Sequence, residues 1–143
     1  MKLKTLCIFT LALSLMACSE DMLNPQHNQA TPMEMPDAKT LKKQPFMLLA
    51  GSWINDTNDL VFHIDSVGNF VMRDSRNAQI TEQTGSLKDV SKSYALNDLR
   101  YELYDNKNQP MHWAFGLRQA DEKTRELLLL DGSTATVFHF NKD

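Results

Sequence analysis

Cysteine is almost missing from this chain. The 143 residues include only Cys7 and Cys18, so residues 19–143 contain no thiol. This excludes a thiolate metal cage, a cysteine nucleophile and a redox pair from any domain formed by that part. Small secreted scaffolds held together by disulfides are also a poor match.

The chain also lacks an apolar run long enough to cross a membrane. Its most hydrophobic stretch, around residues 6–13, is about a dozen residues long, whereas a transmembrane helix needs roughly 20. Lys2 and Lys4 precede this stretch and small residues follow it. This layout is typical of a bacterial signal peptide, which we predict to span residues 1–17 and to be removed.

Positive charge is scarce. The precursor carries 15 basic and 18 acidic side chains, and loss of Lys2 and Lys4 with the signal peptide leaves 13 basic residues. Because phosphate binding needs a concentrated basic surface, the sequence predicts no nucleic-acid partner. It also contains no glycine-rich phosphate-binding loop.

Leu15-Met16-Ala17-Cys18 resembles the lipobox of bacterial lipoproteins, with Met16 as a departure at the second position. The resemblance implies that Cys18 is acylated and becomes the first residue of the mature chain. Several acyl chains on one residue would anchor it stably, since each buried methylene contributes about 0.8 kcal/mol. Ser19, where some lipoproteins carry aspartate, favours the outer membrane, and Ser19-Glu20-Asp21 resembles surface-export signals of Bacteroides-type lipoproteins. We therefore expect a protein anchored to the cell envelope through its N-terminal lipid, on the periplasmic or surface face.

We predict that residues 18–44 are the lipidated cysteine followed by a disordered tether. Prolines at 25, 32 and 36 lie among polar residues, and branched apolar residues are few. About 26 flexible residues would reach roughly 30 Å. A short helical turn is possible only from Asp37 to Lys43.

Residues 45–143 form the predicted folded domain. A helical turn begins at Pro45, and Gly51-Ser52-Trp53-Ile54 begins the first strand. Turn signals recur at short intervals after that point, which is typical of an antiparallel all-β domain. They are Val67-Gly68-Asn69, residues 74–77, Asn97-Asp98, residues 105–108 and Asp131-Gly132.

Hydrophobic alternation supports the strands. Met111, Trp113, Phe115 and Leu117 share one face, a period of two that a helix does not present. Residues 79–90 are weakly patterned and predict one irregular strand pair. Residues 127–130 are four leucines, so a strand through them is apolar on both faces. We expect the outer face to be covered by the turn at 45–50 or by neighbouring strands; the alternative is an interaction surface.

The stretch Leu49-Ala50-Gly51-Ser52-Trp53, placed between a helical turn and about eight strands, resembles the lipocalin-like barrels of bacterial lipoproteins. The resemblance implies a small up-and-down barrel in which Gly51 and Trp53 lie on the first strand and the indole plugs the closed end. It also implies an arginine packed over that indole, either Arg118 or Arg125. The Thr-Asp-Tyr signature of larger lipocalins is absent, and a small β-sandwich is the alternative fold.

An eight-stranded barrel is just wide enough to be filled by side chains or to hold one small ligand. Seven aromatic residues are candidates for the interior, which favours a filled barrel. They are Trp53, Phe62, Phe70, Trp113, Phe115, Phe138 and Phe140.

The sequence predicts no active site. His63, Asp65 and Ser66 are nearly adjacent on an extended strand and cannot converge on one atom. His63, His112 and His139 fall on the face opposite the aromatic residues, so they would bind zinc or copper only if their strands were neighbours. We therefore expect no catalytic residue, no metal and no cofactor.

These observations predict a non-enzymatic binding or interaction module. Two alternatives remain open, a carrier of a small apolar ligand inside the barrel and an inhibitor of an envelope hydrolase. The expected partners are the membrane, through the lipid on Cys18, and an envelope protein or a small apolar ligand.

Overall fold

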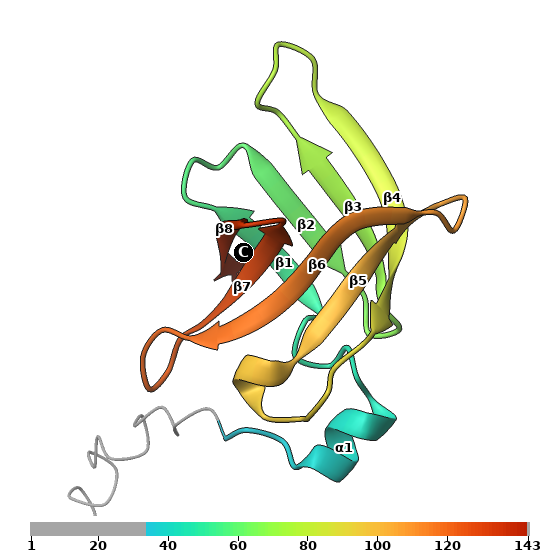
Figure 1. The fold of residues 1–143 in the computed structure, drawn as a ribbon. Coiled ribbons are helices and arrows are strands. Elements are labelled where there is room, and N and C mark those ends of the chain that lie inside the picture. Colours follow the sequence, from blue (N-terminus) through green and yellow to red (C-terminus); the bar gives the residue numbers. More distant parts are fainter. Residues whose placement is uncertain (1–33, 143) are drawn as a thin grey trace, which may run out of the picture. The chain divides into compact units, whose positions relative to one another are not determined.

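A computed structural model describes residues 34–142, which form a closed eight-stranded barrel after one short helix (Figure 1). Helix α1 spans Ala38–Lys43, and a 3-10 turn, η3, spans Leu96–Asp98. The strands are β1 (Gly51–Asn55), β2 (Leu60–Ile64), β3 (Asn69–Asp74), β4 (Thr81–Asp89), β5 (Arg100–Asp105), β6 (Pro110–Gln119), β7 (Arg125–Asp131) and β8 (Thr134–Asn141).

Each strand pairs antiparallel with the next one along the chain. β8 then pairs with β1, with Trp53 opposite Phe140, and this pairing closes the barrel. The predicted all-β, up-and-down barrel is confirmed, and the alternative of a small β-sandwich is wrong. The turns β1–β2, β3–β4, β5–β6 and β7–β8 lie at one end, called the mouth. The other end, which carries α1 and residues 45–50, is called the closed end.

Helix α1 lies inside the segment expected to be tether. Asp37 caps it by accepting a hydrogen bond from the Thr40 backbone N–H at 2.6 Å, and Leu41 is fully buried. Residues 44–50 follow as hydrogen-bonded turns, including Ala50 N–H to the Phe46 carbonyl at 3.0 Å. The helix coincides with the segment from Asp37 to Lys43 where the sequence allowed a short helical turn.

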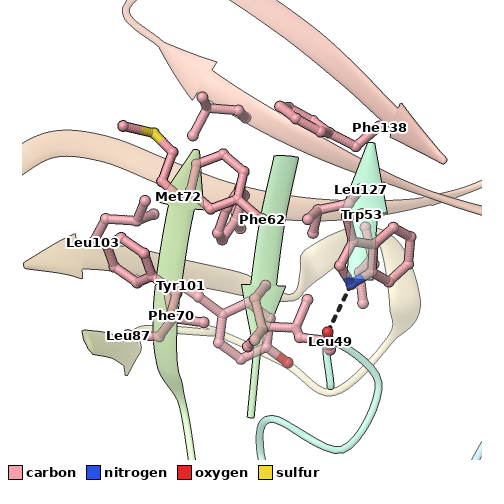
Figure 2. Close-up of a cluster of buried hydrophobic side chains, with 14 of the residues drawn as sticks. Leu49, Trp53, Phe62, Phe70, Met72, Leu87, Tyr101, Leu103, Leu127 and Phe138 are labelled. Carbon is pink, nitrogen blue, oxygen red and sulfur yellow. Dashed lines mark hydrogen bonds between the residues drawn. The ribbon is translucent and has the colours of Figure 1, made fainter. Parts of the chain in front are cut away.

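The interior is filled by side chains from all eight strands (Figure 2). Phe62 lies at its centre, with ring centroids 5.8, 4.9 and 5.4 Å from those of Phe70, Phe115 and Phe138. Each pair meets edge to face, the arrangement that aromatic rings prefer. This packing agrees with the expectation of a filled barrel, although Phe140 is 47% exposed and Trp113 only partly buried.

One expectation about the strands is wrong, and one irregularity was not predicted. Residues 79–90 contain one regular strand, β4, and no strand pair; its pattern is weak because Gly85 takes an inward position and the upper half is polar. In β6 the pairing with β5 jumps from Ala114 opposite Glu102 to Pro110 opposite Tyr104. The extra residues form a bulge around His112, which has a φ of 61°.

The four leucines divide between the two faces of β7. Leu127 and Leu129 are buried inside, whereas Leu128 and Leu130 point outward and are half-buried. Their outward neighbours on β6 and β8 are small or apolar, namely Ala114, Gly116, Ala135 and Val137. The turn at 45–50 does not cover them, because it packs at the closed end, where Pro45 accepts a hydrogen bond from Tyr101.

Candidate functional site at the barrel mouth

The closed end is a packed plug. The Trp53 side chain is 2% exposed, and its indole N–H donates to the Leu49 carbonyl oxygen at 2.7 Å (Figure 2). The Phe140 ring meets the indole edge to face with centroids 5.2 Å apart. Gly51 has a φ of 131°, and a Cβ there would overlap the Phe140 ring, so glycine is required.

Two more contacts hold residues 45–50 over this end. The Tyr101 hydroxyl donates to the Pro45 carbonyl oxygen at 2.8 Å, and the Phe46 ring lies 5.9 Å from the Tyr101 ring, centroid to centroid. Burial raises the pKa of the Tyr101 phenol well above its usual value. The plug therefore consists of packed rings and hydrogen-bonded polar atoms.

The two candidate arginines have different environments. Arg118 is exposed and forms an ion pair with Glu126. Arg125 is only 8% exposed, and this burial lowers the pKa of its guanidinium. Continuing the β7–β8 register by one residue aligns Arg125 with Phe140, which is itself opposite Trp53. Arg125 is thus the arginine that shares an interior row with the tryptophan.

The mouth holds a hollow of about 210 Å³. Its floor is apolar, made by Leu60, Met72, Trp113 and Leu129. Polar side chains from β7, β8 and the β3–β4 turn form its rim: Arg76, Asp131, Thr134 and Thr136. It is smaller than typical pockets for small molecules, which begin near 300 Å³.

The turns around the mouth are mostly acidic. Arg76 pairs with Asp74, with Nη2 to Oδ2 at 2.5 Å, and lowers the pKa of that carboxyl to about 2. Hydrogen bonds from Asn55 and Thr57 likewise lower the pKa of Asp59. The acidic side chains are Asp56, Asp59, Asp74, Glu82, Asp105 and Asp131, against Arg73, Arg76 and Lys107. The mouth therefore presents a net negative surface at neutral pH.

One buried amide organises the β1–β2 turn at the mouth. The Asn55 Oδ1 accepts from the backbone N–H groups of Asp59, at 3.1 Å, and Leu60, at 3.0 Å. Its Nδ2 donates to the Thr57 hydroxyl at 2.9 Å and to Asp59 Oδ1 at 2.7 Å. Because Asn55 is 8% exposed, this turn is a fixed part of the rim.

The histidines and the aspartate considered from the sequence each bind a different partner. His63 Nδ1 lies 2.6 Å from the hydroxyl oxygen of Ser52, on the neighbouring strand, and Asp65 binds the backbone of its own turn. His139 Nε2 lies 2.7 Å from Asp56 Oδ1 and so links β8 to the β1–β2 turn.

The three strand histidines are also separated. They lie on β2, β6 and β8, and no two of these strands are neighbours in the barrel. Within residues 34–142, no three histidine, cysteine or acidic side chains are grouped as metal ligands.

Sequence reasoning missed most of the rim. Arg76, Asp131, Thr134 and Thr136 follow no motif, since they come from separate turns that only barrel closure brings together. Cys18, the predicted lipidation site, lies outside the described residues.

No family model, no curated protein and no solved structure matches this chain. Across the part that the structure describes, no helix is both long enough and apolar enough to span a bilayer.

Proposed function

We propose that this chain is a lipid-anchored envelope protein whose barrel is a non-enzymatic interaction module, and that the mouth is its contact surface. The observation that carries the proposal is the filled interior. Side chains occupy the barrel up to the mouth, where a hollow of about 210 Å³ remains. Recognition is then a matter of surface contact, with the apolar floor receiving one side chain of the partner.

The charge around the mouth specifies the chemistry of that partner. The turns and strand ends at the mouth carry six carboxylates and three cationic side chains, of which Asp131 and Arg76 line the hollow. Surfaces of complementary potential steer association and exclude like-charged partners. The expected partner is therefore an envelope protein with a basic surface and a protruding apolar side chain.

Photo-crosslinking from the anchored protein tests this proposal. A photoreactive amino acid replaces Thr134, exposed at the mouth, or Lys123, exposed in the β6–β7 turn at the closed end, as the matched control. A discrete crosslinked protein is expected from position 134 alone, and its yield should fall with added salt and in an Asp131→Lys variant. Equal products from both positions, or none from 134, would contradict the proposal.

The anchor is tested separately. Cys18→Ala should abolish labelling by a palmitate analogue and move the protein from the membrane fraction to the soluble one. Met16→Ala, which leaves the cysteine in place, is the control and should remain labelled. A Cys18→Ala protein that stays labelled would reject the lipoprotein assignment without affecting the proposal for the mouth.

The apolar floor also favours a second candidate, a carrier of a small apolar group. Met72 and Trp113 would contact such a group directly. A saturable shift of Trp113 fluorescence emission on addition of a short-chain alcohol, measured in a Trp53→Phe variant to remove the other tryptophan, would detect it. The third possibility, an inhibitor of an envelope hydrolase, differs only in the partner that crosslinking would identify.

A further inference from the structure

The β3–β4 hairpin extends beyond the neighbouring strand β5 at the mouth of the barrel. β3 pairs with β4 from Asn69 opposite Ser86 to Asp74 opposite Thr81. β5 pairs with β4 only up to Gly85 opposite Asp105, where the chain turns back into β6. Thr81–Thr84 therefore have a strand on one side alone, and Figure 1 shows the β3–β4 hairpin extending beyond the neighbouring turns.

We propose that this free edge of β4 binds an extended polypeptide segment of another protein, which adds a strand to the barrel wall. Strand addition uses the backbone N–H and C=O groups of an exposed sheet edge, so it needs no ligand cavity. The inference concerns a different surface from the mouth hollow and does not depend on the lipid anchor.

The edge lacks most features that normally prevent strand addition. Proteins protect exposed edges with lysine, proline, bulges or a covering segment. Thr81–Thr84 contains no lysine and no proline, its pairing with β3 is unbroken, and all four residues are exposed. Two of the four are threonines, which favour extended backbone. Glu82 is the only charged residue on the edge.

A hollow lies where β5 leaves β4. It measures about 620 Å³ and is walled by Thr84 and Ser86 on β4 and by the β5–β6 turn, with Asn106 and Asn108. These side chains can donate and accept hydrogen bonds. The hollow lies at the end of the free edge, so it can receive a polar side chain of the added strand.

Charge selects the residue of the incoming strand that lies opposite Glu82. Opposite charges directly across a strand pair stabilise it, and like charges destabilise it. Asp105, at the hollow, adds a second carboxylate, while Arg73 lies opposite Glu82 on β3. The segment that fits best therefore carries lysine or arginine opposite Glu82 and uncharged residues on either side.

A second copy of this chain fits the edge poorly. Two copies related by a two-fold axis pair symmetrically about one residue. A centre at Glu82 places two glutamates opposite each other. If the two-fold axis passes at Gln83 instead, residue 81 of the second copy must pair with Gly85. That position is already taken, because Gly85 pairs with Asp105 of β5. Another protein is thus the better occupant.

The test uses the mature chain with Cys18→Ser and three capped seven-residue peptides of alternating threonine and valine. One has lysine at its centre, one has glutamate there, and one is the lysine peptide with alternate backbone nitrogens methylated. Backbone amide shifts of ¹⁵N-labelled protein report binding. The lysine peptide should shift Thr81–Thr84 and residues 105–108, the glutamate peptide should bind about fivefold more weakly, and the methylated peptide should not bind.

Two charge variants sharpen the result. Glu82→Lys should reverse the order of the lysine and glutamate peptides. Glu102→Lys should leave it unchanged, because Glu102 is an exposed carboxylate on β5 with strands on both sides. Equal binding of the methylated peptide, shifts confined to the mouth hollow, or a dimer that protects the amides of Thr81–Thr84 from exchange would each overturn the proposal.

Discussion

The two ends of the barrel each contain one of the chain's two tryptophans, and they use it differently. At the closed end, Trp53 is buried, hydrogen-bonded to Leu49 and stacked edge to face with Phe140. At the mouth, Trp113 follows a bulge and is half-buried beside a polar rim. The comparison teaches that stability is concentrated at one end, and that the other end is left with apolar surface for recognition.

Truncating the two tryptophans should give the largest contrast. Trp53→Ala removes a fully buried ring and its hydrogen bond, so the free energy of unfolding should fall by about 3–5 kcal/mol. Trp113→Ala should cost only about 1–2 kcal/mol, because its ring already contacts solvent. Urea denaturation followed by circular dichroism measures both. Equal losses would remove the distinction between the ends.

The mouth has one stability element of its own, the amide of Asn55. Asn55→Ala leaves the backbone N–H groups of Asp59 and Leu60 without their acceptor, so the free energy of unfolding should fall by about 2 kcal/mol. Asn77→Ala, which removes an exposed amide from the β3–β4 turn, is the control and should cost less than about 0.5 kcal/mol. A loss for Asn55→Ala no greater than this control would show that the β1–β2 turn is not held by the amide.

The hydroxyl of Tyr101 gives a smaller effect at the closed end. Tyr101→Phe removes the hydrogen bond to Pro45 and should cost about 1 kcal/mol at neutral pH. It should also change how the free energy of unfolding decreases at alkaline pH. Because the pKa of the folded phenol is raised, the wild type loses stability as pH rises above about 10, where the unfolded phenol ionises first.

Melting temperatures between pH 8 and 11 check this prediction. The decline should be shallower in Tyr101→Phe than in the wild type, with the rest due to other phenols such as Tyr94 and Tyr104, whose pKa values are also raised. Tyr104→Phe is the comparison variant. If the melting temperature of Tyr101→Phe falls with pH as steeply as that of the wild type, ionisation of Tyr101 is not the cause of the decline.

The ion pair at the rim should give the smallest effect. The pKa of Asp74 is lowered to about 2, so the stabilisation from its carboxylate is present above about pH 4 and is lost as pH falls toward 2. Arg76 is half-exposed, and solvent screening limits the pair to less than about 1 kcal/mol. In Arg76→Gln the melting temperature should fall slightly less between pH 4 and pH 2 than in the wild type. Addition of 1 M salt should remove this difference. A loss of several kcal/mol would show that the mouth contributes as much stability as the plug.

Prediction from sequence worked where one periodicity dominated. Phe115 and Leu117, placed on one face by their alternation, are both buried. It failed at β4, where Gly85 replaces an apolar side chain and nothing marks the inward face. At β6 the alternation identified the residues that pack against the core, but it gave no sign of the bulge around His112, because the number of residues between two pairings cannot be read from hydrophobicity.

The free edge of β4 was equally hidden. Its existence depends on the stagger between β3 and β5, which are both six residues long but pair with opposite ends of β4. The hollow at the mouth is similar, since its rim comes from residues 76 and 131–136, which are distant along the chain. Neither feature has a local signal.

The sequence by itself determined the class of this protein. Alternating apolar residues between frequent turns impose strands, and the lack of thiols beyond Cys18 excludes thiol chemistry. Only the tertiary structure decided which end is sealed and which is open. Barrel closure brings β8 against β1, so the space around Trp53 is filled while unequal strands leave the mouth uncovered. That outcome depends on register and side-chain volume together, and no local stretch of residues contains both.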